Sequence, residues 1–349
     1  MSILNISIKN YKSLVDLEIN NPAPFTVFVG ANASGKSNIF EALDFFYHFI
    51  WLTRATALQL FGGIDDLSFK NKKGTPGFNI KIQSQGDIDS ALFDILANES
   101  SILLDVSPIS NSDLETFSSI VAESESLYNL KSIRSNPAYI EFWKWKFFTR
   151  IFINNDRIPQ LPFNDDQKLS PLCDNLEKVL KRLLKDENTK EEIIEWLRLL
   201  VPGLENIEIK SEAFSGTDNL LIYEKGTDKP FTKHLISDGT FNIIAILAAV
   251  FQSDQPQFLC FEEPENGLNP KVVRELVGFF REQCKKKGHF IWLNTHSQTL
   301  IRELTTEEII LVDKIDGETK IKQIQGENLY GLPMDEALLT NAIGGGIPW

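Results

Sequence analysis

Eight consecutive residues near the start of the sequence have the spacing of a phosphate-binding loop. The segment Gly30-Ala31-Asn32-Ala33-Ser34-Gly35-Lys36-Ser37 matches G-x-x-x-x-G-K-[ST] in full. Its glycines let backbone N–H groups surround phosphate oxygens, and a helix that follows directs its positive N-terminus at the anion. We expect Lys36 to contact the β- and γ-phosphates of a nucleoside triphosphate and the Ser37 hydroxyl to ligate Mg²⁺. The predicted nucleotide-binding residues of this segment are Gly30, Asn32, Ala33, Ser34, Gly35, Lys36, Ser37 and Asn38.

Two adjacent acids follow a short apolar run in the second half of the sequence. Residues 258–261 (FLCF) read as a buried strand, which ends in Glu262 and Glu263. Ligands of α/β sheets bind at the carboxyl ends of strands, and adjacent strand residues point to opposite faces. One carboxylate can therefore hold Mg²⁺ through water while the other polarises the water that attacks a γ-phosphate. The alternative is an acidic surface turn, which the phosphate loop in the same chain disfavours.

Two further segments have spacings that suit the same site. Ser237, Asp238 and Gly239 precede the apolar residues 241–251, which is typical of a helix N-terminus. His296 follows the apolar run of residues 290–294 (FIWLN). Taken alone, helix capping explains the serine, and a structural hydrogen bond explains the histidine. Their places before and after the acidic strand favour roles in a nucleotide site.

The phosphate loop needs a strand before it and a helix after it, and the sequence supplies both. Residues 25–29 (FTVFV) read as a buried strand, and apolar positions between 39 and 50 recur at helical spacing. From Leu235 onward helical and strand patterns alternate, as in a parallel α/β sheet. The remaining expectations are a strand hairpin over 3–19, turns and β structure over 61–85, weak helices over 87–135, a strand over 142–153, and amphipathic helices over 176–184 and 191–200.

Composition restricts the class of protein. The chain has 349 residues, of which 42% are hydrophobic and 24% charged, so collagen-like, low-complexity and disordered classes are excluded. Its 25 phenylalanines indicate an aromatic-rich core. No apolar run reaches the ~20 residues of a membrane span, and the N-terminus lacks a signal-peptide pattern. Three cysteines at unrelated spacings form no disulfide framework or metal motif, so we expect a cytoplasmic protein with no membrane partner.

The net charge of the chain argues against electrostatic binding of nucleic acid over its whole surface. The net charge is −13, whereas binding to phosphate backbones needs clustered lysine and arginine. A local basic groove stays possible, because one face of the helix expected over 176–184 is basic. That face is either solvated or a nucleic-acid contact, and it consists of Lys178, Lys181, Arg182 and Lys185.

The acidic strand end, with the sequence EEPENGLNP, resembles the Walker B and D-loop segments of ABC-type ATPases in the RecF, SMC and OLD-like branch. More narrowly, the sequence resembles stand-alone prokaryotic AAA family ATPases of the AAA15/AAA21 group, often found in phage-defence operons. The resemblance implies that Glu262 is the Mg²⁺-side acid, where transporters have Asp, and that Glu263 is the catalytic glutamate. It implies that His296 is a switch that senses the γ-phosphate. The segment at Ser237 would be the signature, which contacts the γ-phosphate held by another subunit.

The resemblance implies an α/β fold, the ABC-ATPase head of P-loop NTPases, with an N-terminal antiparallel β subdomain, a parallel core sheet and a helical insertion. The expected divisions are 1–85 with the phosphate loop, 86–200 as a mostly helical insertion with a returning strand, and 201–349 with signature, Walker B, D-loop and switch. The glutamine of a Q-loop is not fixed by spacing, and Gln83 and Gln85 are both candidates.

The implied function is an ATPase that uses ATP and Mg²⁺, dimerises on ATP and controls a separate effector such as a nuclease. The setting would be anti-phage defence or a toxin–antitoxin-like system. Because the sequence ends soon after the ATPase core, we expect the effector on another chain. A RecF-like DNA-binding repair ATPase is the alternative, against which the net charge and the lack of coiled-coil arms count. A transporter subunit is disfavoured because transporter signatures read LSGGQ. Residues 344–349 (GGGIPW) either fold back on the ATPase or dock on a partner.

Overall fold

The computed structural model describes residues 2–52, 54–70, 76–85, 90–98, 102–109, 147–152, 165–212 and 216–340. Residues 344–349, for which we expected folding back or docking, lie outside these ranges. The chain forms two compact units: unit 1 is Met1–Phe148 with Leu304–Trp349, and unit 2 is Thr149–Glu303. Within the described ranges, no helix is both long and apolar enough to cross a membrane.

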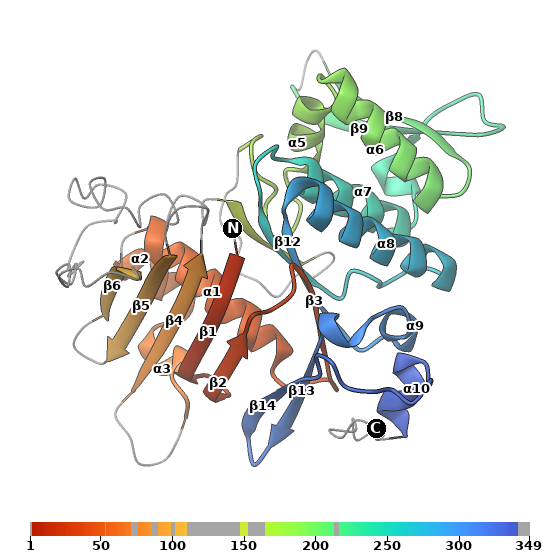
Figure 1. Cartoon of the computed structure of the whole chain (residues 1–349). Coiled ribbons are helices and arrows are strands. Elements are labelled where there is room, and N and C mark those ends of the chain that lie inside the picture. The colour runs from red at the N-terminus through yellow and green to blue at the C-terminus, as the bar shows by residue number, and fades with distance from the viewer. Residues whose placement is uncertain are drawn as a thin grey trace. The chain divides into compact units, whose positions relative to one another are not determined.

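An antiparallel sheet of five strands forms much of unit 1, in the order β2-β1-β4-β5-β6 (Figure 1). The predicted hairpin at the N-terminus is confirmed, with Ile8 opposite Leu17 across its two strands. Where the structure describes burial, alternate apolar residues are buried, such as Ile6 and Ile8 or Ile80 and Ile82, as expected for a sheet with one covered face. The strands are β1 (Ser2–Tyr11), β2 (Leu14–Asn20), β4 (Gly77–Gln85), β5 (Ser90–Asn98) and β6 (Ile102–Ile109).

The last two strands correct our expectation of weak helices over residues 87–135. Residues 90–98 and 102–109 are strands, and 110–135 lie outside the described part of the chain. Burial in β5 has a period of two, because Phe93, Ile95 and Ala97 are buried while Asp94 and Leu96 between them are not. Pairing with β4 along the whole strand outweighs the helical propensity of Ala and Leu. Among the described residues of the insertion, the α-helices lie between residues 176 and 200.

A helix rich in phenylalanine covers one face of this sheet. It is α1 (Lys36–Trp51), which follows the phosphate loop as predicted. The Phe45 ring lies 5.3 Å from Phe78 of β4, and the Phe46 ring 5.9 Å from Phe93 of β5, both edge to face. Part of the expected aromatic core therefore surrounds α1, and a second group of aromatic contacts lies in unit 2, around Phe258 and Phe279. Two short helices, α2 (Arg54–Leu60) and α3 (Ile64–Leu67), follow it.

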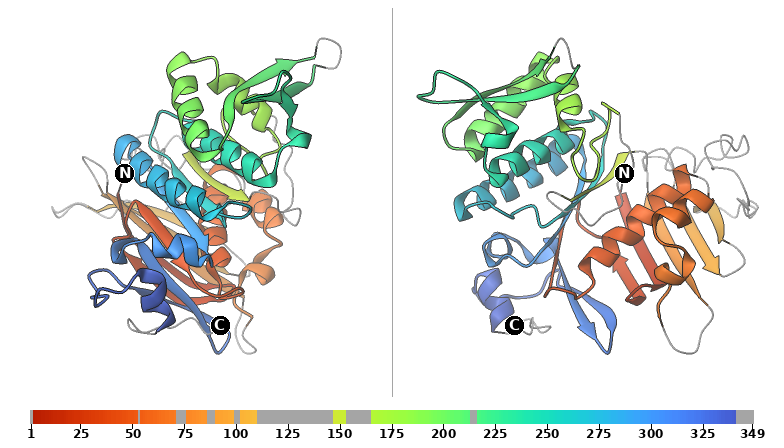
Figure 2. Two further views of the ribbon diagram at one scale, coloured as in Figure 1. Left: turned by 90° about the vertical axis from the view of Figure 1, so that its right-hand side faces the viewer. Right: turned by 180° about the vertical axis from the view of Figure 1, so that it is seen from behind.

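The strand before the phosphate loop pairs with the C-terminal part of the chain. That strand is β3 (Phe25–Val29), and β13 (Ile309–Ile315) runs parallel to it. A second hairpin strand, β14 (Glu318–Gln323), pairs antiparallel with β13 and lies beside β2 (Figure 2). The side chain of Gln323 accepts from the backbone N–H of Asn20 and donates to its carbonyl, both at 2.8 Å. Two short helices, η5 (Thr306–Glu308) and α10 (Met334–Leu339), flank this hairpin in the sequence.

Parallel strands and helices alternate in unit 2, as the sequence predicts. Strands β11 (Phe258–Glu262) and β12 (Phe290–Thr295) are parallel neighbours, and β7 (Phe148–Phe152) lies next to β11. The helices are α5 (Leu176–Leu183), α6 (Glu187–Leu200), α7 (Asp238–Phe251), α8 (Pro270–Lys287) and α9 (Gln298–Arg302). A small antiparallel sheet consists of β8 (Leu204–Ser211), β9 (Asp218–Glu224) and β10 (Phe231–Thr232), followed by the turn η4 (Lys233–Leu235).

Candidate functional site

The phosphate loop connects β3 to α1 in unit 1. Gly35 directly precedes α1 and has a φ of 105°, a left-handed conformation that favours glycine. A Cβ at this position would collide with the hydroxyl of Thr319, so only glycine fits. Ala33 also has a positive φ, 63°. The backbone therefore curves tightly before the helix, as a phosphate loop requires.

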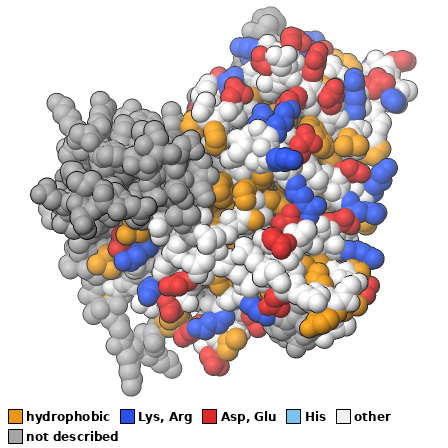
Figure 3. Space-filling model, in the orientation of Figure 1, with side chains coloured by type: hydrophobic (Ala, Val, Ile, Leu, Met, Phe, Trp, Pro, Cys, Tyr) orange, Lys and Arg blue, Asp and Glu red, His pale blue; other side chains and the backbone are white. Residues whose placement is uncertain are grey.

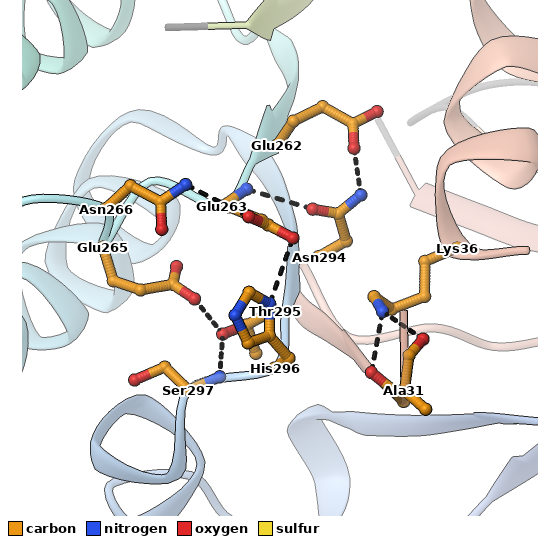
Figure 4. Close-up of polar contacts among 11 residues, drawn as sticks. Ala31, Lys36, Glu262, Glu263, Glu265, Asn266, Asn294, Thr295, His296 and Ser297 are labelled. Atoms are coloured by element: carbon orange, nitrogen blue, oxygen red, sulfur yellow. Dashed lines mark hydrogen bonds and ion pairs between the residues drawn. The ribbon is translucent and has the colours of Figure 1, made fainter. Parts of the chain in front are cut away.

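The cation of the loop is buried against the loop itself. The Nζ of Lys36 donates to the carbonyl oxygens of Gly30, at 2.7 Å, and Ala31, at 2.9 Å (Figure 4). The buried hydroxyl of Ser34 has no hydrogen-bond partner among the described residues. Asn32 and Ser37 are exposed. A buried ammonium, an unpaired hydroxyl and a left-handed glycine form a set of donors that fits nucleotide phosphates.

The carboxylate of Glu262 is held from both sides in unit 2. Its Oε1 accepts from the Nε of Arg150 at 2.9 Å and from the Nη2 of the same side chain. Its Oε2 accepts from the side-chain amide of Asn294 (Figure 4). Both members of the ion pair are largely buried, so each charge compensates the other. With both oxygens engaged, Glu262 fits Mg²⁺ through a bound water better than by direct ligation.

The next residue, Glu263, points to different partners. Its Oε1 lies 3.1 Å from the Nδ1 of His296, and its Oε2 accepts from the side chain of Asn266 at 3.1 Å (Figure 4). Its φ is 49°, which is uncommon for a residue with a side chain and is often found at functional sites. Glu263 and His296 are both partly exposed. The acid and the histidine therefore form one accessible pair.

A third acid in this region is buried. Glu265 is 7% exposed, its Oε1 accepts from the Thr295 hydroxyl, and its Oε2 has no partner among the described residues. Burial raises the pKa of Glu265 to about 7; the charge of Glu263 acts in the same direction, and the Thr295 bond opposes it. The Thr295 hydroxyl also accepts from the N–H of Ser297, at 2.9 Å (Figure 4). Glu265 thus connects the loop after β11 to the residues on either side of His296.

The predicted signature segment begins α7, and its N-cap is confirmed. The Ser237 side chain accepts from the backbone N–H of Thr240 at 3.1 Å. Ser237 and Asp238 are exposed, whereas Gly239 is buried. A Cβ on Gly239 would lie 2.5 Å from the carbonyl oxygen of Gly267. The first turn of α7 therefore packs directly on the segment predicted to be the D-loop, residues 266–270.

The basic face of α5 lines a cavity of about 430 Å³ in unit 2, and its charges are partly paired. The Nζ of Lys181 donates to Asp218 at 2.7 Å, and Arg182 donates to the carbonyl oxygens of Asp166 and Gln252. Acidic and basic side chains also alternate over the face of this unit shown in Figure 3. This surface is not a continuous basic groove. The cavity is lined by Asp165, Asp166, Lys178, Lys181, Arg182, Lys185 and Asp218.

Sequence reasoning missed several residues that contact the predicted ones. An arginine inside the apolar strand β7 was a usable signal for Arg150, because a charge in such a strand needs a partner. Glu265 stood within the acidic segment that we singled out, but nothing in the sequence indicated its burial. Nothing indicated Thr319, which lies 285 residues from the loop that it contacts. Gln83 and Gln85 both pair with β5 within the antiparallel sheet, and the choice between them stays open.

The fold and this arrangement of residues define the head of an ABC-type P-loop ATPase, of the branch that includes SMC and RecF. A family described as "AAA domain, putative AbiEii toxin, Type IV TA system" matches residues 25–302, and the chain belongs to it. The fold and the family match confirm the resemblance and the fold class predicted from the sequence.

Comparisons with individual proteins agree with this assignment. The chain is 20% identical over 365 residues to an ATP/GTP phosphatase of Helicobacter pylori, covering 95% of this chain and 94% of that protein. It is 29% identical over 102 residues to the energy-coupling factor transporter ATP-binding protein EcfA1 of Methanospirillum hungatei. That match covers 29% of this chain and 35% of the relative, so the chain spans about a third of the relative's length.

A solved structure is similar over nearly the whole chain. It is an Smc head bound to the C-winged helix domain of ScpA, with a TM-score of 0.63 and 16% identity. The similarity covers 95% of this chain and 100% of that one. At this identity, the likeness concerns the fold.

Proposed function

We propose that this chain is an ATP-hydrolysing switch subunit that dimerises on ATP and controls a separate effector. The observation that carries the proposal is the pair formed by Glu263 and His296 after two neighbouring parallel strands. A carboxylate within hydrogen-bond distance of an imidazole can accept a proton from water while the imidazole orients it. The relative from Helicobacter pylori, an ATP/GTP phosphatase, supports hydrolysis.

The residues present would divide the work of holding the nucleotide. Lys36 and the N–H groups of the phosphate loop would bind the β- and γ-phosphates, and the Ser37 hydroxyl would ligate Mg²⁺. Glu262 would hold Mg²⁺ through water, because Arg150 and Asn294 already engage its oxygens. Bound Mg²⁺ would neutralise charge on the phosphates. Glu263 would take the proton of the attacking water.

The signature segment supports a dimer. Ser237 and Asp238 are exposed at the N-terminus of a long helix, where positive dipole and free N–H groups favour an anion. Because Gly239 packs on the segment with Glu263 and Asn266, this helix end would move together with the residues of its own site. A γ-phosphate bound between two copies of the chain would thus contact both of them and couple the site of one copy to the site of the other.

An effector on another chain is supported by the family and by the fold. The family description includes a toxin of a type IV toxin–antitoxin system, which fits a defence or toxin–antitoxin module. The similar Smc head binds a winged-helix domain of a separate protein. We therefore propose a cytoplasmic homo-oligomer with a separate effector such as a nuclease. The RecF-like alternative would use the basic face of α5, but Lys181 and Arg182 are already engaged within the unit.

Phosphate release and ATP binding by three variants test the proposal. Lys36→Ala should abolish ATP binding, because it removes the buried cation of the phosphate loop. Glu263→Gln should still bind ATP and hydrolyse it at least ~100-fold more slowly. Glu282→Gln, on the exposed side of α8, is the matched control and should resemble the wild type. Equal rates in the wild type and Glu263→Gln would remove Glu263 from the mechanism.

A further inference from the structure

A chain of hydrogen bonds lies behind the phosphate loop in unit 1. The Nδ2 of Asn38 donates to the Oγ of Ser13 at 2.7 Å, and that Oγ lies 2.6 Å from the Oγ1 of Thr319. The Oγ1 of Thr319 donates to the carbonyl oxygen of Ser34 at 2.9 Å. Thr319 is fully buried, and Ser13 and Ser34 are nearly so. The β13–β14 hairpin is therefore hydrogen-bonded to the phosphate loop through the side chain of Thr319.

The chemistry of the groups fixes the direction of this chain. The carbonyl of Ser34 can only accept, so the hydroxyl hydrogen of Thr319 is directed to it. The amide nitrogen of Asn38 can only donate, so Ser13 accepts from it and gives its own hydrogen to Thr319. Every hydroxyl in the chain donates once and accepts once. A buried network satisfied in this way holds its members in one arrangement.

The bond to Ser34 determines where the next N–H points. In a planar trans peptide, the C=O and the N–H lie on opposite sides of the chain. The hydroxyl of Thr319 draws the Ser34 carbonyl toward the hairpin, so the N–H of Gly35 points away from it. Backbone N–H groups of this loop are the groups that bind phosphate. Removing the hydroxyl would free this peptide to rotate, because Gly35 has no side chain to restrict it.

The hairpin itself is fastened at two places. The N–H of Thr319 donates to the carbonyl of Ser13 at 2.8 Å, which ties β14 to the turn between β1 and β2. Gln323 bonds both backbone groups of Asn20 at the other end of β14. Thr319 is therefore held in place independently of the loop that it contacts.

We propose that Thr319, supported by Ser13, is a positioning residue that orients the Ser34–Gly35 peptide and thereby sets the affinity of the phosphate loop for nucleotide. That the ligand is a nucleotide rests on the proposed function. The orientation of the peptide does not, and it can be measured without nucleotide.

Three variants separate this role from a general loss of stability. Thr319→Val removes the hydroxyl with little change of shape, and Thr319→Ser keeps the hydroxyl. Thr26→Val is the matched control: Thr26 is buried in β3 of the same unit, and its hydroxyl donates to the carbonyl of Ala23 at 2.7 Å. Both valine variants lose one bond from a threonine hydroxyl to a backbone carbonyl, but only one of those bonds reaches the phosphate loop.

Hydrogen–deuterium exchange of residues 30–38 in the nucleotide-free protein is the first measurement. Thr319→Val should raise exchange there by about tenfold, whereas Thr319→Ser and Thr26→Val should not. Exchange in Thr319→Val equal to that of the wild type would overturn the inference. If Thr319→Val does not fold, Ser13→Ala takes its place, since it removes the donor to Thr319, and unchanged exchange in that variant has the same meaning.

Calorimetric titration with a non-hydrolysable ATP analogue and Mg²⁺ is the second measurement. Thr319→Val should bind about tenfold more weakly than the wild type, with Thr319→Ser within about twofold of it. Faster exchange with unchanged affinity, or equal weakening in Thr26→Val, would overturn the role in binding. If the wild type itself binds no nucleotide, the proposed function fails, while the exchange data still decide whether Thr319 orients the loop.

Discussion

Asn294 holds the backbone of Glu263 by two hydrogen bonds from a single N–H. That amide donates to the carbonyl oxygen of Asn294 at 3.1 Å and to its Oδ1 at 3.0 Å. The other end of the same side chain donates to Glu262. One residue of β12 therefore fixes both the direction in which the chain leaves β11 and the carboxylate before that turn. Glu263, with its left-handed φ, is the residue held in this way.

Self-association should depend on the signature serine. Glu263→Gln with ATP and Mg²⁺ should elute from a sizing column as a larger species than the nucleotide-free protein. Adding Ser237→Arg should block this shift while ATP still binds, because the long cation would occupy the exposed start of α7. Ser253→Arg, just beyond the other end of α7, should leave the shift intact. A constant mass in every state would contradict an ATP-dependent dimer.

Gly239→Ala should separate the start of α7 from the loop after β11, which carries Glu263. The added methyl would meet the carbonyl of Gly267 at 2.5 Å, so the backbone must move, at a cost of about 1–3 kcal/mol. We expect ATPase activity to fall with the melting temperature. Gly278→Ala in α8 is the control, because an added Cβ would meet nothing within 4 Å beyond the adjoining backbone of its own helix, and helix propensity should stabilise the variant by about 0.5–1 kcal/mol. Full activity in Gly239→Ala would show that the contact has no functional role.

Glu265 should make the protein less stable as the pH rises. Its pKa is raised from 4.5 to about 7 in the folded state, chiefly by burial, so the folded chain holds the proton more tightly than the unfolded chain. The contribution of protonated Glu265 to the free energy of unfolding is fully present below about pH 4.5. About 3 kcal/mol of it is lost as the pH rises through 7.

Urea unfolding of the wild type and Glu265→Gln between pH 4.5 and 8 measures this effect. The difference between the two free energies of unfolding should move in favour of the glutamine variant as the pH rises. Glu282→Gln on the surface of α8 is the control and should follow the wild type throughout. A constant difference between wild type and Glu265→Gln would show that Glu265 does not titrate in this range.

His289 should have the opposite effect to Glu265 and make the protein less stable as the pH falls. It is fully buried, its Nδ1 accepts from the N–H of Gln257 at 3.1 Å, and its Nε2 donates to the carbonyl of Val250. Burial lowers its pKa from 6.5 to about 4, and the charge of Lys287 adds to this. The contribution of neutral His289 to the free energy of unfolding is therefore fully present above pH 6.5. About 3 kcal/mol of it is lost as the pH falls toward 4.

Replacing His289 by glutamine should remove this acid-dependent loss, whatever the variant's stability at pH 7. Unfolding free energies at pH 7 and pH 4.5 measure the loss in each protein. The exposed His234→Gln serves as the control and should lose as much as the wild type. If His289→Gln loses as much stability as the wild type between these pH values, the buried imidazole is not responsible.

Local chemistry explains how much of the site the sequence predicts. The phosphate loop, the acidic end of β11 and the start of α7 are contiguous segments, and each is defined by residues within a turn of one another. Ser237 caps α7 because its hydroxyl accepts from an N–H three residues later, which is a local interaction. Such features need no knowledge of the rest of the fold.

Contacts between distant segments were beyond sequence reasoning. Arg150 and Glu262 are 112 residues apart, and only the pairing of β7 with β11 brings them together. The strand β5 was mistaken for a helix for the same reason, since its partner β4 decides its conformation. Secondary-structure propensity reflects local preferences along the chain, whereas this ion pair and this strand depend on contacts with segments that are distant in the sequence.

The division of the chain has a consequence for its synthesis. Unit 1 is discontinuous: β3 and the phosphate loop are made early, while β13 and Thr319 follow only after the whole of unit 2. Ser34 leaves the ribosome 285 residues before Thr319, a delay of roughly 15–60 s at ordinary rates of translation. During that interval the whole of unit 2 is translated, whereas β3 has no β13 beside it. A nascent chain thus acquires Glu263 and His296, the pair proposed to hydrolyse ATP, before Thr319 is available to bond the carbonyl of Ser34 in the phosphate loop.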